Sequence, residues 1–389
     1  AFNNFIKGLQ ENINSSIDSE EAIEMLSQHI ITKPIFEALF ENYSFVKNNP
    51  ISSAMEEILN LLLEQQFEKE TTELKEFYDD VRVRVGNIDN SEGKQKIIVE
   101  LYEKFFKTAF PKLVEKLGIV YTPIEVVDFI INSVEDVLKK EFNRSLTDEN
   151  VNILEPFVGT GTFISRLLQS GNIKPKDLER KYKKEIFANE IVLLAYYIAT
   201  VNIENIYHDL NNKAEYKEFE GICLTDTFQL GEDKEESQLI FNSFKENSER
   251  VKRQKNAPLQ IIFGNPPYTI GQNSANDNAQ NKKYPILDNR ILETYSKESS
   301  AGLNKALYDA YIKAFRWATD RLNKNGGVIG FVTNGAWIDG TATSGFRKTI
   351  EKEFTSIYVF NLRGNQRTSG EISRKEGGKI FGGGSRTPI

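Results

Sequence analysis

Apolar positions recur at helical spacing through the first part of the chain, up to about residue 116. Segments 22–30, 36–40, 55–62 and 101–110 each place apolar side chains three or four residues apart, which predicts helices. None of these segments brings together residues with an evident catalytic use. The pattern therefore predicts an all-α domain over residues 1–116 that packs against or connects other parts of the protein.

From residue 117 onward, short apolar runs alternate with helical segments. The runs at 151–154, 185–188, 221–224, 259–264, 328–332 and 356–360 are typical of strands, and segments 124–138, 193–203 and 307–322 have helical periodicity. This alternation favours a mostly parallel, Rossmann-like α/β sheet. The glycine-rich stretch 382–384 indicates a turn toward a further strand, so we expect the sheet in this sequence to lack its last strand.

The tetrapeptide Asn265-Pro266-Pro267-Tyr268 directly follows the run 259–264. Two prolines end the strand and stiffen the backbone, at the sheet edge where open α/β folds bind ligands. An amide oxygen and a proline carbonyl can accept both hydrogens of a planar amino group, and a tyrosine ring can stack on the base that carries it. The set suits methylation of an exocyclic NH2, although Asn-Pro is also common in ordinary turns.

A second motif, Glu155-Pro156-Phe-Val-Gly159-Thr-Gly161-Thr162, follows the run 151–154. Its glycines allow a tight turn and a close approach of the backbone to a ligand. The helix that follows, with Thr162 as its expected cap, would favour an anionic group at its N-terminus. Two glycines separated by one residue are a weak signal alone, but the flanking residues strengthen it.

Acidic residues end the next two predicted strands. In nucleotide-binding α/β folds, an acidic residue at the position of Glu190 accepts hydrogen bonds from ribose hydroxyls. Asp226 could receive the amino group of an adenine. The plainer alternatives are a solvated strand-end glutamate and a turn-capping aspartate.

The segment Tyr121-Thr122-Pro123 precedes the predicted helix 124–138. Pro123 near the first helical position and Thr122 near the cap are ordinary helix-start residues. The functional alternative is a lid over one end of a bound cofactor. A polar stretch rich in Asn, Ser and Gln, 269–302, predicts a long loop. The loop is either a disordered insertion or, as its place after the tetrapeptide favours, a lid on the substrate side.

Composition narrows the setting. One cysteine, Cys223, excludes an internal disulfide and fits the cytoplasm. One cysteine and two histidines also argue against zinc, so no metal site is expected. No apolar run approaches the ~20 residues that a membrane span needs. The net charge of −7 does not indicate a basic DNA-binding face, so much of any DNA binding is expected from parts outside this sequence.

These motifs resemble those of N6-adenine DNA methyltransferases of the γ motif order, over residues 97–389. The sequences LYEKFFKTAF at 101–110 and IFGGGSRTPI at 380–389 are similar to those of single-polypeptide, Type ISP restriction-modification enzymes. The resemblance implies that residues 1–116 are a coupler domain and 117–389 the methyltransferase catalytic domain. Nuclease, ATPase and target-recognition domains would belong to the parent polypeptide but not to this sequence.

The resemblance further implies S-adenosylmethionine as cofactor and double-stranded DNA as substrate. Around the cofactor it implies that Tyr121, Thr122 and Pro123 close over the methionine end, that Glu155, Pro156, Gly159, Gly161 and Thr162 form the floor, that Glu190 holds the ribose and that Asp226 holds the adenine. The family usually has Asp where Glu155 stands. Phe228 or Ile191 would pack on the cofactor's adenine ring.

On the substrate side, the resemblance implies that Tyr268 stacks on a flipped adenine while Asn265 and Pro266 accept its amino hydrogens. Two other readings stay open. Protein-glutamine methyltransferases also carry Asn-Pro-Pro-Tyr, because a side-chain amide is a planar NH2 too, but they lack the Tyr-Thr-Pro lead-in. A catalytically silent cofactor-binding scaffold is the second alternative.

Overall fold

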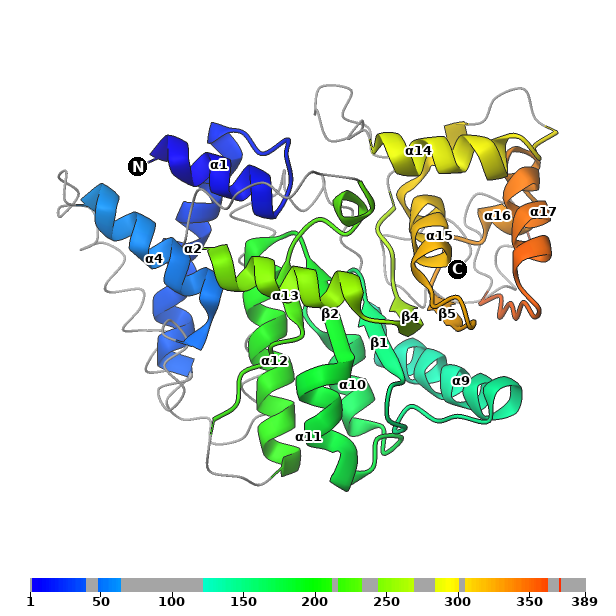
Figure 1. Cartoon of the computed structure of the whole chain (residues 1–389), viewed down its shortest axis with the longest axis horizontal. Coiled ribbons are helices and arrows are strands. Elements are labelled where there is room, and N and C mark those ends of the chain that lie inside the picture. Colours follow the sequence, from blue (N-terminus) through cyan, green and yellow to red (C-terminus); the bar gives the residue numbers. More distant parts are fainter. Residues whose placement is uncertain are drawn as a thin grey trace.

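The centre of the molecule is a five-stranded parallel sheet of order β3-β2-β1-β4-β5. The computed structural model describes residues 2–39, 48–63, 122–211, 216–232, 244–268, 284–300, 305–362 and 371. The strands are β1 (Asn152–Glu155), β2 (Ile186–Glu190), β3 (Ile222–Leu224), β4 (Leu259–Gly264) and β5 (Val328–Phe331). The chain therefore builds outward from β1 in one direction and then, at β4, in the other (Figure 1).

Both faces of this sheet are covered. Neighbouring side chains on a strand point to opposite faces, and they lie in two different apolar clusters. In β1, Ile153 belongs to one apolar cluster and Leu154 to another. Ile261 and Ile262 of β4 alternate in the same way. The short apolar runs of β1 to β4 are thus buried on both faces, as expected for a parallel sheet, whereas β5 is half-buried throughout.

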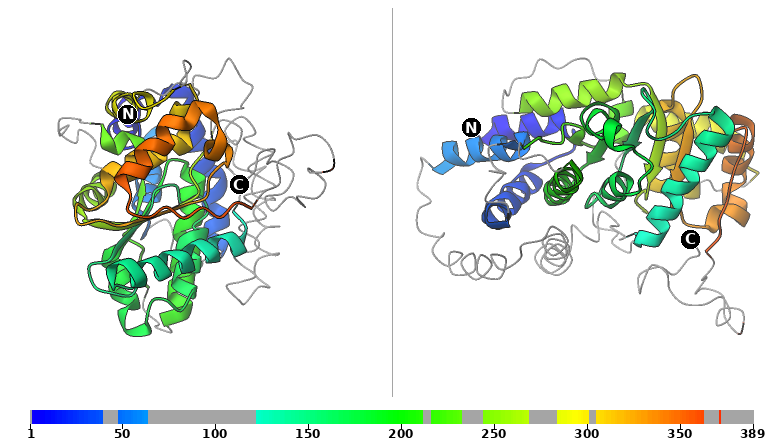
Figure 2. Two further views of the ribbon diagram at one scale, coloured as in Figure 1. Left: turned by 90° about the vertical axis from the view of Figure 1, so that its right-hand side faces the viewer. Right: turned by 90° about the horizontal axis from the view of Figure 1, so that it is seen from below.

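The helices form a layer on each face of the sheet (Figure 2). One layer consists of α9 (Ile124–Phe142), α10 (Thr162–Gln169) and α12 (Leu193–Asn211). On the other side lie α13 (Lys245–Asn256), α14 (Pro285–Ile291) and α15 (Ala310–Arg321). The remaining short helices are α11 (Leu178–Arg180), α16 (Ala336–Asp339) and, somewhat longer, α17 (Ser344–Glu353). Among the described residues, no helix combines the length and apolar character needed to cross a bilayer.

The helical N-terminal part packs directly against the sheet domain through α12. Its helices are α1 (Phe2–Asn12), α2 (Ser19–Leu39) and α4 (Pro50–Leu63). The Nδ1 atom of His29 lies 2.9 Å from the Tyr197 hydroxyl, and Asn49 donates to the Tyr196 hydroxyl at 3.4 Å. Helix α12 is apolar on nearly all sides because the sheet covers one side and these helices cover another. A single apolar cluster includes side chains of both parts.

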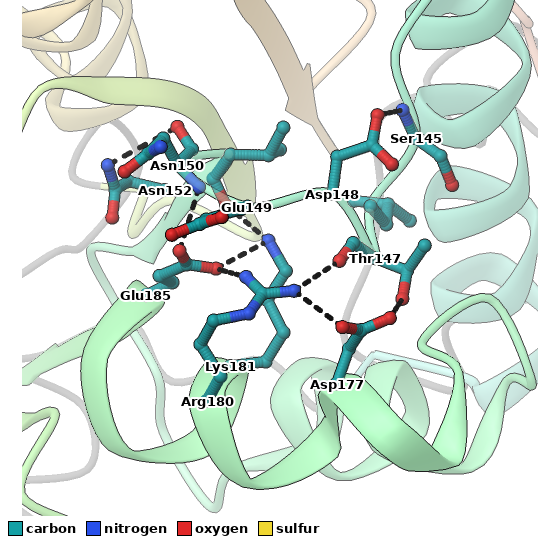
Figure 3. A network of polar contacts seen from close by, with 12 residues as sticks. Ser145, Thr147, Asp148, Glu149, Asn150, Asn152, Asp177, Arg180, Lys181 and Glu185 are labelled. Carbon is teal, nitrogen blue, oxygen red and sulfur yellow. Dashed lines mark hydrogen bonds and ion pairs between the residues drawn. The ribbon is translucent and has the colours of Figure 1, made fainter.

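A closed polar network holds the amino edge of the sheet (Figure 3). Lys181 is fully buried; its ammonium donates to the Val151 carbonyl at 2.8 Å and lies 2.9 Å from Glu185. Arg180 also pairs with Glu185 and donates to the Thr147 carbonyl at 2.8 Å. The other carboxylate oxygen of Glu185 accepts the Asn150 backbone N–H at 2.7 Å. These bonds join the segments that lead into β1 and β2.

The predicted α/β class, the helical N-terminal part and five of the six predicted strands are confirmed, with ends shifted by one or two residues. The sixth prediction is wrong: residues 356–360 form no strand. A strand needs a hydrogen-bonded neighbour, and among the described residues this segment has none. It lies along α9 instead, with the Phe360 ring 4.8 Å from that of Phe129. The predicted domain boundary near 116 and the helix at 101–110 fall outside the described residues.

Candidate functional site

The sheet order reverses between β1 and β4, and open α/β folds bind ligands beyond the carboxyl ends of the strands at such a point. At this edge, four of the five strands, β1 to β4, lead into a polar side chain from the sequence motifs. Glu155 ends β1, Glu190 ends β2, Asp226 follows β3 and Asn265 follows β4. The parallel register therefore gathers at one edge residues that are up to 110 positions apart in the sequence.

The glycine loop after β1 contains two glycines with left-handed backbone angles, and they do different things. At Gly159 (φ +54°) an added Cβ would meet no atom within 4 Å, so the backbone faces open space. At Gly161 (φ +84°) an added Cβ would lie 3.1 Å from the Ala199 Cα atom of α12. Gly159 thus leaves room for a ligand, whereas Gly161 permits close packing of α12.

Thr162 does not cap the helix after this loop, contrary to the prediction. It is the first residue of α10, and Gly161 occupies the cap position without a side-chain hydrogen bond. The Thr162 hydroxyl lies 3.3 Å from that of Thr160. Because Gly161 adopts the left-handed conformation at the cap position, the helix begins one residue earlier than predicted.

Glu190 organises the loop from the end of β2. One of its oxygens accepts the Gly159 N–H at 2.8 Å, and the other accepts the N–H groups of Ile191 and Val192, each at 2.9 Å. Burial raises the pKa of this carboxyl to about 7, although the three backbone N–H groups act in the opposite direction. Glu190 therefore fixes Gly159 and remains able to accept a further donor on one oxygen.

Glu155 is the least satisfied acid in the site. It is 1% exposed, and its Oε2 atom has no hydrogen-bond partner. Burial raises the pKa of this carboxyl well above its usual range, and the nearby Glu190 adds to the effect. A buried carboxyl oxygen without a partner is costly. Glu155 Oε2 is therefore a buried oxygen whose hydrogen-bonding capacity is unused within the described residues.

Asp226 collects donors from three separate segments. Its Oδ1 accepts the Phe228 backbone N–H at 3.0 Å, and its Oδ2 accepts the Tyr284 hydroxyl at 2.8 Å. The Asn14 side-chain amide also donates to Oδ2. The carboxylate is 4% exposed and is fixed in orientation by these bonds. Phe228 is enclosed between the rings of Phe157 and Tyr284, whereas Ile191 is half-buried.

Asn265 is held between two other motif residues. Its amide nitrogen donates to the Thr122 hydroxyl at 3.0 Å, and its oxygen lies 2.8 Å from the Tyr268 hydroxyl. That hydroxyl is also 3.2 Å from the Val332 carbonyl. Since a tyrosine hydroxyl has one hydrogen, it donates to one of these oxygens at a time. The Tyr268 ring packs near that of Tyr311, with centroids 5.8 Å apart.

The remaining predicted residues have mainly structural contacts. Pro123 caps α9, and its carbonyl accepts the Val126 and Val127 N–H groups at 3.0 and 3.1 Å. The Pro156 carbonyl accepts the Thr227 hydroxyl, which links the glycine loop to β3. Pro266 is buried and Pro267 half-buried. Tyr121 lies outside the described residues. In the part of the chain that the structure describes, no group of three or more His, Cys, Asp or Glu could hold a metal ion.

Sequence reasoning missed three residues of this edge: Asn14, Thr227 and Tyr284. Asn14 is 212 positions from the carboxylate that it contacts. Tyr284 lies inside the polar stretch 269–302, and no motif marks it. The prediction of one long loop there is wrong at its carboxyl end, because α14 (Pro285–Ile291) begins directly after Tyr284. Thr227 stands beside Asp226, which is the one local signal by which it could have been found.

The fold and this arrangement of residues define a class of protein. The chain belongs to the N-6 DNA Methylase family, whose profile matches residues 93–307. Residues 1–93 match the coupler domain of Type ISP restriction-modification enzymes. The chain therefore combines the two parts that the sequence motifs indicated.

Solved structures agree with this assignment. A nuclease-deletion mutant of the Type ISP enzyme LlaGI, in complex with a DNA substrate mimic, is 54% identical with a TM-score of 0.92; the match covers 99% of this chain and 31% of that one. The ATP-dependent Type ISP enzyme LlaBIII bound to DNA is 49% identical with a TM-score of 0.91; the match covers 100% of this chain and 26% of that one. The chain of a DrdV–DNA complex is 37% identical with a TM-score of 0.90; the match covers 100% of this chain and 37% of that one. The chain thus spans about a third or less of the first two relatives. No curated protein sequence matches it.

Proposed function

We propose that this chain transfers a methyl group from S-adenosylmethionine to the N6 amino group of an adenine in DNA. The observation that carries the proposal is the position of Asn265 at the topological switch point of the sheet. Its amide nitrogen donates to Thr122, and its amide oxygen lies beside the Tyr268 hydroxyl, which can instead donate to the Val332 carbonyl. Membership of the N-6 DNA Methylase family supports it. The cofactor supplies an electrophilic methyl group on a sulfonium centre.

The residues at the carboxyl edge fit this cofactor. The partnerless Glu155 Oε2 suits an ammonium group, and the open space at Gly159 leaves room beside the loop. Glu190 keeps acceptor capacity for a ribose hydroxyl, and Asp226 for the adenine amino group. Thr122, with its neighbours Tyr121 and Pro123, would close over the methionine end.

The amino group of adenine is inaccessible inside a duplex, so the base must leave the stack. Asn265 and the Pro266 carbonyl would then accept the two amino hydrogens and draw electron density onto the nitrogen. The Tyr268 hydroxyl can release Asn265 by turning to Val332 without losing a hydrogen bond. Tyr268 would also stack on the flipped ring. Orientation of the reacting nitrogen supplies most of the rate. The nitrogen becomes acidic only after methylation and then releases one proton to water, so no strong base is needed beforehand.

The parent polypeptide is part of this proposal. We infer that double-stranded DNA is gripped through a recognition domain outside this sequence, and that nuclease and ATPase domains belong to the same polypeptide, as in Type ISP enzymes. A cytoplasmic setting is consistent with the single cysteine.

Titration calorimetry with S-adenosylmethionine and S-adenosylhomocysteine tests the cofactor site, and one-to-one binding is expected. Isotope-labelled methyl transfer to duplex DNA, with a glutamine-containing peptide as a parallel substrate, then tests the acceptor. Label in N6-methyladenine supports the proposal, and label only in the peptide would assign the glutamine reaction instead. Absence of binding to both ligands would overturn the cofactor assignment.

A further inference from the structure

The coupler part of the chain reaches the methyltransferase site through the turn that contains Ile13 and Asn14. Asn14 lies in the turn between α1 and α2, and its side-chain amide donates to the Asp226 carboxylate. The same turn makes a backbone contact, since the Asp226 N–H donates to the Ile13 carbonyl at 3.2 Å. The end of β3 is thus held by the helical N-terminal part through two bonds.

Asn14 is built to point its nitrogen at Asp226. Its side chain is 2% exposed, and its amide oxygen accepts both the backbone N–H and the hydroxyl of Ser16, at 2.8 and 2.6 Å. These two donors fix which end of the amide is oxygen. The nitrogen therefore faces the Asp226 carboxylate. Because the amide is already fixed in this orientation, ligand binding does not have to order it.

The acceptor capacity of Asp226 leaves room for one ligand hydrogen bond. A carboxylate has about four lone-pair sites. Asn14 and Tyr284 donate to Oδ2, and the Phe228 N–H donates to Oδ1. The site that remains is on Oδ1, and the two bonds to Oδ2 determine the plane in which it lies.

We propose that Asn14 is a positioning residue for the adenine end of the cofactor, so that the coupler domain is a component of the cofactor site. The inference rests on the proposed function, because it takes Asp226 as the acceptor of the cofactor's amino group. Removing Asn14 would let the carboxylate rotate and would weaken the bond from Oδ1 to that group. Since coupling between binding and conformation is reciprocal, cofactor binding would in turn hold the turn at residues 13–16 in place.

The test compares two ligands on three proteins. S-adenosylhomocysteine carries the amino group, and S-inosylhomocysteine has a carbonyl oxygen in its place that cannot donate to Asp226. Calorimetry with both ligands is carried out on the wild-type chain, Asn14→Ala and the control Ser15→Ala. Ser15 lies in the same turn and makes an exposed contact, 3.2 Å from Gln229. Thermal unfolding of each protein checks that it is folded.

In the wild-type chain, the adenosyl ligand is expected to bind more tightly than the inosyl ligand. In Asn14→Ala this affinity ratio is expected to fall about tenfold, a size typical for loss of a hydrogen bond to a charged group. Ser15→Ala is expected to keep the wild-type ratio. Asn14→Asp, which places a second carboxylate beside Asp226 while keeping the oxygen that accepts from Ser16, is expected to lower the ratio at least as far.

Each other outcome overturns a definite statement. Equal losses of affinity for both ligands in Asn14→Ala, with the ratio unchanged, would make Asn14 a packing residue of the interface. Unchanged affinities in a folded Asn14→Ala protein would also reject the inference, while the proposed function would stand. Failure of the wild-type chain to bind either ligand, or to prefer the adenosyl one, would instead reject the cofactor assignment itself.

Discussion

The two edges of the sheet both contain buried charged groups, but they use them differently. At the amino edge, Lys181, Arg180 and Glu185 satisfy one another and the backbone around them (Figure 3). At the carboxyl edge, Glu155 has an oxygen without a partner, and burial raises the pKa of both Glu155 and Glu190. The first arrangement stabilises the fold, whereas we propose that the second leaves hydrogen-bonding capacity for the cofactor.

The comparison predicts that substitutions at the two edges separate into effects on function and effects on stability. When a polar side chain at the carboxyl edge is replaced, affinity or rate should fall while the free energy of unfolding changes little. At the amino edge, the free energy of unfolding should fall while binding per folded molecule is kept. Substitutions at Asn265, Glu185 and Glu190 test this separation.

The largest effect is expected from Asn265→Ala. It removes an acceptor that acts on the reacting amino group, so methyl transfer to DNA is expected to fall about 10²–10³-fold in kcat, as for other single groups that stabilise a transition state. Binding of S-adenosylhomocysteine should be kept. The matched control is Asn323→Ala at the amino edge, where the side chain accepts only the exposed Asn325 N–H. Loss of cofactor binding in Asn265→Ala would instead make the tetrapeptide structural.

At the opposite edge, Glu185→Leu leaves the buried Lys181 and its neighbour Arg180 without their shared carboxylate. Breaking a buried pair in this way costs about 3 kcal/mol or more, which denaturant unfolding would measure. Glu149→Gln, an exposed acid close by, is expected to stay within about 0.5 kcal/mol of the wild type. If Glu185→Leu lowered cofactor affinity per folded molecule, the separation of the two edges would be lost.

Glu190 links the cofactor's expected ribose contact to pH. Burial raises its pKa to about 7, so below that pH the free protein holds a proton on the group that should accept the ribose hydroxyl. Affinity for S-adenosylhomocysteine is expected to fall toward tenfold per pH unit below about pH 7 and to be flat above it. In Glu190→Gln affinity should be lower at high pH and lack this slope, and a wild-type slope in the variant would reject the assignment.

Substitution of Glu190 should affect stability differently from substitution of Glu185, because burial opposes the charged form of Glu190. The folded-state pKa of Glu190 lies above the unfolded value of 4.5, so its contribution to stability is fully present below pH 4.5 and is lost as the pH rises to about 7. At about pH 8, Glu190→Gln should therefore be no less stable than the wild type, even though it binds more weakly. Comparison of unfolding midpoints at about pH 4 and pH 8 would measure this.

The smallest effects are expected within the glycine loop. Gly159→Ala adds a methyl group in open space and should cost about 1 kcal/mol, from the left-handed backbone alone. Gly161→Ala adds the contact with α12 and should cost clearly more, with unfolding midpoints as the measurement. Cofactor affinity should respond more to Gly159→Ala. The reverse order of stability would contradict the roles assigned to the two glycines.

The sequence predicted what depends on local pattern. Strands β1 to β4 were found because buried strands are continuous apolar runs, and β5 was found as an apolar run although it is only half-buried. Glu155, Glu190, Asp226 and Asn265 were found because each follows such a run. Segment 356–360 has the same apolar composition but no partner strand among the described residues, and composition alone does not reveal pairing. The start of α10 was misplaced by one residue because the backbone angle of Gly161 decides it.

Contacts between distant segments could not be predicted in this way. Nothing in the sequence around Asn14 distinguishes its turn from any other Asn- and Ser-containing turn, and its partner lies 212 residues away. The reach of Glu190 to the Gly159 N–H likewise depends on how β1 and β2 align. The types of residue in the site follow from the sequence, but their hydrogen-bond partners follow from the fold.

Helix α12 has a consequence for how such chains can be recombined. The family profiles divide the sequence at residue 93, yet Tyr196 and Tyr197 of α12 are buried against helices from the other side of that division. A coupler exchanged between two relatives would meet a foreign α12 and leave its aromatic side chains badly packed. A chimaera should therefore take the α12 side chains that face the coupler, among them Tyr196 and Tyr197, from the same parent as the coupler.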